Sequence, residues 1–234
     1  MSTYVLIHGG LGGAWCWDKV VPLLEERGHR VVAPDLPGHG RDTTPVSEVT
    51  MEAYVNCVCN VLDAQPEPVI LVGHSMGGAI ITQAAEYRPD RIKTLVYLAA
   101  FLPQNGEFTG GIDDTESLLR PNVVMSDDGS YITFRDEILK EACYADCSDE
   151  DVARAKSLMC PQATLPNITP VVTTEANFGR VPRVYITTLR DRALSPYVQK
   201  QMYTALPCRV ISMDTSHSPM FSTPGELVDI LVSL

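Results

Sequence analysis

Apolar runs alternate with helix-like segments along both ends of the chain. Six short runs indicate strands, at residues 3–8, 29–35, 68–73, 92–100, 183–188 and 208–213. Stretches with helical spacing separate them, at residues 14–28, 51–65, 77–88, 195–206 and 225–234. Strands that are apolar throughout are buried on both faces, which is typical of a parallel sheet covered by helices. The alternation therefore predicts an α/β fold.

The middle of the chain breaks this rhythm. Residues 103–180 are rich in Asp, Glu, Pro and Asn. Within them, residues 123–134 indicate a small hairpin around Asp128-Gly129, and residues 148–159 indicate a helix that Ser148 caps. We expect residues 103–180 to be an inserted lid, or cap, in a core formed by residues 1–102 and 181–234, because such long connections are usually functional. The alternative is an irregular part of the core.

The segment Gly73-His74-Ser75-Met76-Gly77 lies between a predicted strand and a predicted helix. It matches G-x-S-x-G, in which a sharp strand-to-helix turn lifts the serine hydroxyl above the sheet. The glycines remove the Cβ atoms that would collide at such a turn. We therefore predict Ser75 as a nucleophile; the alternative is a plain strand-to-helix turn.

A serine hydroxyl needs a base to take its proton. Where G-x-S-x-G carries the nucleophile, the acid and then the histidine follow it in the chain. His217 alone among the five histidines follows Ser75, directly after the last predicted strand. Asp191 lies in the loop after residues 183–188 and is predicted to orient the imidazole. Asp214 is the second candidate, although it shares a loop with His217.

The glycine-rich segment after the first strand suggests an oxyanion hole. The two glycines of "HGG" at positions 8–10 allow a backbone N–H to approach a substrate oxygen, so the N–H groups of Gly10 and Met76 are the predicted donors. A dinucleotide-binding loop is the alternative for this segment, but G-x-G-x-x-G fails because Trp15 stands where its third glycine is required.

Charge and cysteine usage limit the possible partners and compartments. The formal net charge is −11, which argues against nucleic acid and anionic membranes as partners because their phosphates would be repelled. The seven cysteines match no zinc-binding spacing, so no metal site is predicted, and free thiols are typical of a reducing cytosol. No signal peptide and no membrane-spanning run are recognised, so a cytoplasmic location is expected.

The chain resembles the α/β-hydrolase superfamily, and within it the branch of plant methylesterases, hydroxynitrile lyases and bacterial esterase relatives. The similar segments are residues 5–40, "GHSMGG" (73–78), "LVYLAAFLP" (95–103), "ARAKSLMCPQ" (153–162) and "GRVPRVYITTLRD" (179–191). The resemblance implies a three-layer fold with a mostly parallel sheet of about six strands. It also implies a catalytic triad of Ser75, Asp191 and His217.

Two departures from the lyases of this branch favour ester hydrolysis. Those enzymes carry a threonine where this chain has Gly9, and a lysine where it has Ser218. A third departure, "DLPGHG" at residues 35–40, is commoner in bacterial hydrolases and argues against plant hormone substrates.

The sequence therefore predicts a serine carboxylesterase that forms an acyl-enzyme on Ser75 and hydrolyses small aryl, alkyl or methyl esters. No cofactor is expected, and the protein is expected to be a monomer or homodimer. The predicted substrate pocket comprises Gly9, Leu11, Trp15, Leu102, Met125 and Phe178. Three alternatives stay open: a lyase that cleaves a C–C bond, a lactone or amide hydrolase with the same triad, and a ligand-binding receptor with little turnover.

Overall fold

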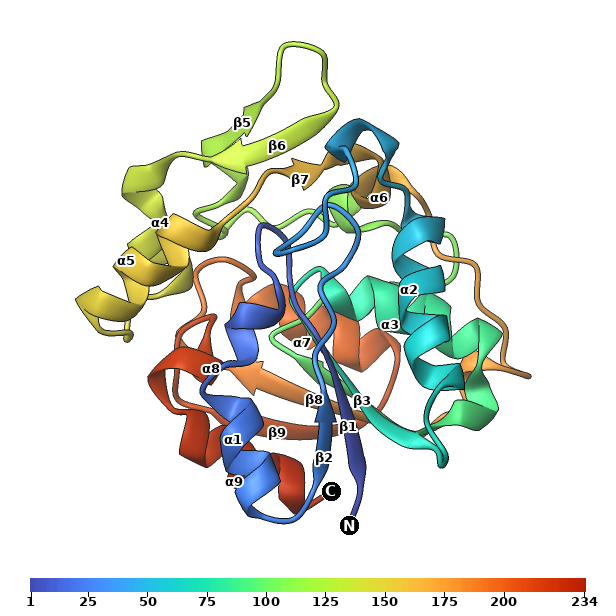
Figure 1. Cartoon of the computed structure of the whole chain (residues 1–234). Helices are drawn as coiled ribbons and strands as arrows, with labels where there is room; N and C mark the ends of the chain where they lie inside the picture. The colour runs from blue at the N-terminus through green and yellow to red at the C-terminus, as the bar shows by residue number, and fades with distance from the viewer.

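The computed structural model describes residues 1–234 and contains one large sheet (Figure 1). Its six strands follow the order β2-β1-β3-β4-β8-β9, and every neighbouring pair is parallel. The strands are β1 (Thr3–Ile7), β2 (Arg30–Val32), β3 (Val69–His74), β4 (Ile92–Leu98), β8 (Arg183–Thr188) and β9 (Arg209–Met213). All six coincide with predicted runs, which confirms the expected α/β fold.

Helices cover both faces of this sheet and make three layers (Figure 1). Side chains of α2 (Met51–Asp63), α3 (Gly77–Tyr87) and α7 (Pro196–Ala205) form one apolar core with one face of the strands. Side chains of α1 (Val20–Glu26), α8 (Pro219–Ser222) and α9 (Pro224–Val232) form a second core with the other face. Alternate strand residues enter the two cores, because successive side chains of a strand point to opposite faces.

The predicted helix over residues 14–28 is divided into two pieces. A 3-10 turn, η1 (Ala14–Trp17), precedes α1, which begins only at Val20. Pro22 lacks the N–H that a helix interior requires, but it is tolerated in the first turn of a helix that begins at Val20. The sequence therefore gave the helical region correctly but missed its interruption.

Residues 103–180, called here the inserted segment, connect β4 to β8. Most of them gather beyond one end of the large sheet, and residues 172–180 return alongside α3 (Figure 1). They contain the antiparallel strands β5 (Val123–Met125), β6 (Tyr131–Phe134) and β7 (Gln162–Ala163). Three helices accompany these strands: α4 (Asp136–Cys143), α5 (Asp149–Leu158) and α6 (Thr164–Ile168). The hairpin around Gly129 and the helix capped by Ser148 are both confirmed.

Short 3-10 turns complete the secondary structure: η2 (Val46–Glu48), η3 (Pro89–Arg91), η4 (Thr109–Gly111), η5 (Arg120–Asn122) and η6 (Phe178–Arg180). No helix is both long and apolar enough to cross a membrane.

The parallel arrangement of the large sheet has one consequence for function. The loops after β1, β3, β8 and β9 leave the same edge of the sheet, which brings together residues far apart in the sequence.

Candidate active site

Ser75 lies at the sharp turn between β3 and α3, in a backbone conformation that side chains rarely adopt. Its φ angle is +52°. A Cβ atom on Gly73 would lie 2.7 Å from the carbonyl oxygen of Gly77, and one on Gly77 would lie 2.7 Å from that of His8. The Ser75 N–H donates to the carbonyl oxygen of Leu98 at 3.3 Å, which holds the turn against β4. Sterics therefore require glycine on both sides of the serine.

His217 and Asp191 meet above the same edge of the sheet. The Nδ1 atom of His217 is 2.7 Å from Oδ2 of Asp191, and both side chains are buried. Because a carboxylate accepts hydrogen bonds, this contact places the imidazole proton on Nδ1. Asp214 lies elsewhere: its side chain is 79% exposed and pairs with Arg190. Of the two carboxylates considered from sequence, the structure brings Asp191 to the histidine.

A network of donors fixes the Asp191 carboxylate. The backbone N–H groups of Ala193 and Leu194 donate to Oδ1 at 2.8 and 2.9 Å. The hydroxyl of Thr188 and the amide of Gln199 donate to Oδ2 at 2.9 and 3.0 Å. Gln199 is completely buried on α7. These bonds stabilise the charged carboxylate and hold it in one orientation toward the ring.

The other ring nitrogen of His217 and the Ser75 hydroxyl are free of protein partners. Nε2 of His217 and Oγ of Ser75 make no hydrogen bond within the protein. Neither atom is among the fully buried polar atoms that lack a partner, so both are accessible from the cavity side. Ser75 and His217 line one cavity of about 230 Å³. They are not hydrogen-bonded to each other here, and catalytic hydrogen bonds often tighten only when substrate binds.

The backbone around Gly10 is oriented by a buried histidine. The N–H of Leu36 donates to Nε2 of His8 at 3.2 Å, so Nδ1 carries the proton and donates to the Gly9 carbonyl at 2.8 Å. Burial and the neighbouring His39 lower the pKa of His8 to about 3, so this ring stays neutral. In a trans peptide the N–H points opposite to the carbonyl, which turns the Gly10 N–H away from His8.

Gly10 and Met76, the two predicted oxyanion donors, both line the cavity of Ser75 and His217. Neither backbone N–H donates a hydrogen bond within the protein. Met76 also directly precedes α3, where unpaired N–H groups and the positive end of the helix dipole favour negative charge. The cavity thus offers two free N–H donors beside the serine.

The remaining cavity wall is mostly apolar and comes largely from the inserted segment. Its main apolar contributors are Leu119, Val123, Ile132, Phe134, Leu139 and Met159. Sequence reasoning missed all six. The pairs Ile132 and Phe134 on β6, and Leu139 and Cys143 on α4, have the spacing of residues that share one face. That spacing was an available signal, but it does not say what the face covers.

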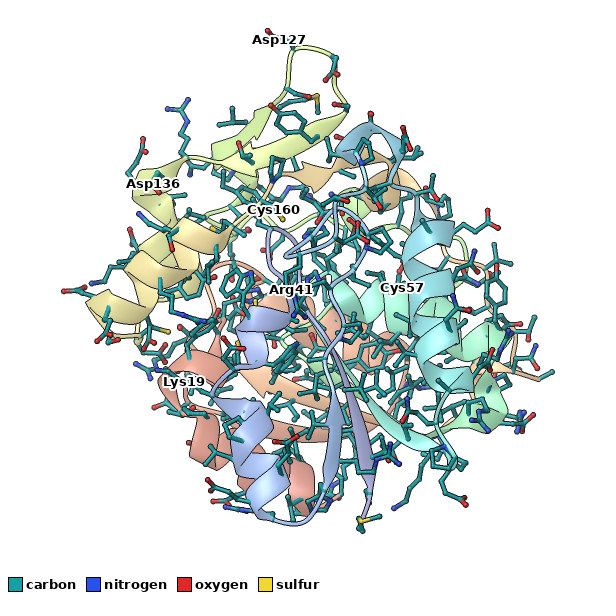
Figure 2. All side chains as sticks on the ribbon, viewed as in Figure 1. Lys19, Arg41, Cys57, Asp127, Asp136 and Cys160 are labelled. Atoms are coloured by element: carbon teal, nitrogen blue, oxygen red, sulfur yellow. The ribbon has the colours of Figure 1, made fainter.

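Four of the six predicted pocket residues do not line the cavity that contains Ser75 and His217. Trp15 packs against Phe221, Leu102 faces a separate hollow beside α7, and Phe178 is buried beneath the guanidinium of Arg183. Met125 is 57% exposed near the tip of the β5–β6 hairpin, where Figure 2 labels Asp127.

The other two predicted pocket residues lie at the site. Leu11 lines the cavity. Gly9 lies directly behind Ser75, where an added Cβ would come within 2.8 Å of the serine Cβ. That crowding explains why a small residue is needed there. No group of three or more His, Cys, Asp or Glu side chains is arranged to hold a metal ion.

Comparisons with known proteins agree with this architecture. A family model described as "Alpha/beta hydrolase family" matches residues 4–230. The chain is 37% identical to a pyrethroid hydrolase of Sphingobium wenxiniae, covering 99% of this chain and 86% of that protein. It is 33% identical to Methylesterase 9 of Arabidopsis thaliana, covering 100% of this chain and 98% of that protein.

A solved structure extends the comparison. The crystal structure of a pyrethroid hydrolase from Sphingobium faniae superposes with a TM-score of 0.90 at 34% identity, covering 99% of this chain and 96% of that one. Its coverage includes the inserted segment as well as the sheet. The chain therefore belongs to the alpha/beta hydrolase family, in its methylesterase-like branch.

Proposed function

We propose that this protein is a serine carboxylesterase. The observation that carries the proposal is the 2.7 Å contact between Asp191 and the His217 ring, with Ser75 on its strained turn in the same cavity. The relatives named pyrethroid hydrolase and methylesterase support the same reaction class. Both names denote hydrolysis, and the second denotes hydrolysis of an ester.

In the proposed mechanism, Nε2 of His217 removes the proton as Ser75 Oγ attacks the ester carbonyl carbon. The carbonyl oxygen becomes an oxyanion that the N–H groups of Gly10 and Met76 stabilise. His217 then donates its proton to the leaving alcohol, and an acyl-enzyme remains on Ser75. Water, activated by the same imidazole, releases the acid, while Asp191 stabilises the imidazolium formed in each half-reaction.

The cavity favours small, apolar esters. Its volume of about 230 Å³ lies below the range of about 300–1,000 Å³ that is usual for drug-sized ligands. Its wall is mostly apolar, and Arg120 is its one Asp, Glu, Lys or Arg side chain. We infer that residues 103–180 act as a lid whose apolar side chains select the acyl or alkyl group. Larger esters would require this lid to shift.

The test is hydrolysis of p-nitrophenyl and methyl esters by the wild type and by Ser75→Ala. We expect the variant to lose about 10⁴-fold or more in kcat, because the covalent route is removed. A fluorophosphonate should label the wild type and not the variant. Retention of most activity in Ser75→Ala would refute the mechanism, and failure of the reagent to label the wild type would favour a ligand-binding role.

A further inference from the structure

The loop that carries Asp191 is held by a buried carboxylate of the inserted segment. This acid loop comprises residues 189–195, after β8. Asp114, which is 4% exposed, accepts a hydrogen bond from the Ser195 N–H at 2.7 Å. Nearby, the hydroxyl of Ser117 donates to the Ala193 carbonyl oxygen at 2.6 Å. The acid loop is therefore hydrogen-bonded to the inserted segment as well as to its own strand.

The loop that carries His217 is held in the same way by a second carboxylate. This histidine loop comprises residues 214–218, after β9. Oδ2 of Asp146 accepts from the Ser216 N–H at 2.8 Å, and Oδ1 accepts from the Ser216 hydroxyl. Arg190 of the acid loop lies 3.4 Å from Asp146 and also donates to the Asp214 carbonyl oxygen at 2.6 Å. Asp146 thus contacts both loops.

Neither carboxylate lines the cavity. Asp114 and Asp146 therefore cannot act by touching a substrate in that cavity. Each one instead fixes the backbone within a few residues of a catalytic side chain. Hydrogen bonds to a charged acceptor are about twice as strong as neutral ones, so they hold position well.

We propose that Asp114 and Asp146 are positioning residues that set the relative placement of Asp191 and His217. The inserted segment would then align the acid and the base in addition to shaping the cavity. The proposal rests on the serine esterase mechanism above. It predicts a defect in turnover, because misplacement of catalytic groups by about 1 Å can cost about 100-fold in rate.

The experiment compares Asp114→Ala and Asp146→Ala with a matched control, Asp136→Ala. Asp136 is also a carboxylate of the inserted segment, but it lies on the surface at the start of α4 and pairs with Lys156 of the same segment (Figure 2). With p-nitrophenyl acetate, Asp114→Ala and Asp146→Ala should each lose about 10- to 100-fold in kcat with KM changed less than about twofold. The control should keep both constants.

Two further readouts separate positioning from general loosening. The proton resonance of His217 Nδ1–H should shift or broaden in Asp146→Ala and stay unchanged in Asp136→Ala. Asp146→Asn retains one carbonyl oxygen for the Ser216 N–H, so its kcat should lie between those of the wild type and Asp146→Ala. This conservative variant also carries the test if Asp146→Ala does not fold.

The outcomes distinguish this proposal from the mechanism on which it rests. A folded Asp146 variant with unchanged kcat, or with raised KM and constant kcat, would overturn the positioning role. Retention of activity in Ser75→Ala would instead overturn the esterase mechanism. A loss of kcat in both Asp114→Ala and Asp146→Ala, with the imidazole resonance altered, supports the proposal.

Discussion

The central sheet and the inserted segment differ in how they contribute to the site. Every residue of β1 and β3 is buried, whereas every residue of β5 in the inserted segment is exposed. The sheet presents Ser75 and the proposed oxyanion donors through backbone geometry, which crowding by neighbouring main chain enforces. The inserted segment contributes side chains: an apolar wall and two carboxylates. The reacting groups of the proposed mechanism therefore come from the tightly packed sheet, whereas the inserted segment supplies most of the apolar cavity wall and the contacts proposed to align those groups.

The first test of this comparison is the dependence of the free energy of unfolding on pH, and it has the largest expected effect. His8 and His74 are buried in the core, and the inserted segment contains no histidine. Burial, aided by a neighbouring imidazole, lowers the pKa of His8 to about 3 and holds that of His74 well below its usual value. Below pH 6.5 the unfolded chain binds protons that the folded chain cannot, so each ring should cost about 1.4 kcal/mol of stability per pH unit.

This cost begins near pH 6.5 and, for His8, continues down to about pH 3. It is measured by urea unfolding between pH 7.5 and 4.5, with hydrogen exchange to locate the opening. His74→Asn should reduce the slope of the free energy of unfolding against pH by the contribution of one imidazole, about 1.4 kcal/mol per pH unit. An unchanged slope in that variant, or opening confined to the inserted segment, would show that the buried histidines of the core do not cause the loss of stability in acid.

The second test is steric and should have a smaller effect. A Cβ atom on Gly78 would lie 2.1 Å from the carbonyl oxygen of Phe101, which is backbone and cannot move aside. Gly78→Ala should therefore lower the free energy of unfolding by about 3 kcal/mol or more. Gly225→Ala is the control, since nothing lies within 4 Å of its added Cβ and α9 should gain up to about 1 kcal/mol. Equal stabilities in denaturant would refute the crowding argument.

The third test concerns substrate choice and has the smallest expected effect. Phe134 lines the cavity from β6, whereas Phe178 is buried outside it. Phe134→Ala should raise the ratio of kcat/KM for p-nitrophenyl hexanoate to that for the acetate by about tenfold, because one or two methylenes in an apolar pocket are worth this much. Phe178→Ala should lower stability and leave the ratio unchanged. If the ratio of kcat/KM for the two esters changed in Phe178→Ala and not in Phe134→Ala, Phe178 rather than Phe134 would line the substrate pocket.

The comparison also explains which predictions from sequence succeeded. The four inner strands were identified because continuous apolar runs indicate burial on both faces, whereas the edge strands β2 and β9 are partly exposed. The turn at Ser75 was identified because only glycine tolerates the neighbouring main chain there. The steric requirement is therefore visible in the sequence as the two glycines that flank the serine. Most of the cavity wall was not identified: Phe101 lines it and its neighbour Leu102 does not, although both are large and apolar. No periodicity distinguishes two such residues in an irregular segment.

The sequence by itself determined the alternation of strands and helices, the glycines around Ser75 and the order in which serine, aspartate and histidine follow one another. These features are encoded within a few residues or in chain order. Only the tertiary structure decided that Asp191 and not Asp214 contacts His217, and that Asp114 and Asp146 accept hydrogen bonds from the acid loop and the histidine loop. Those contacts join residues distant in the chain, and such pairing depends on how whole elements pack together.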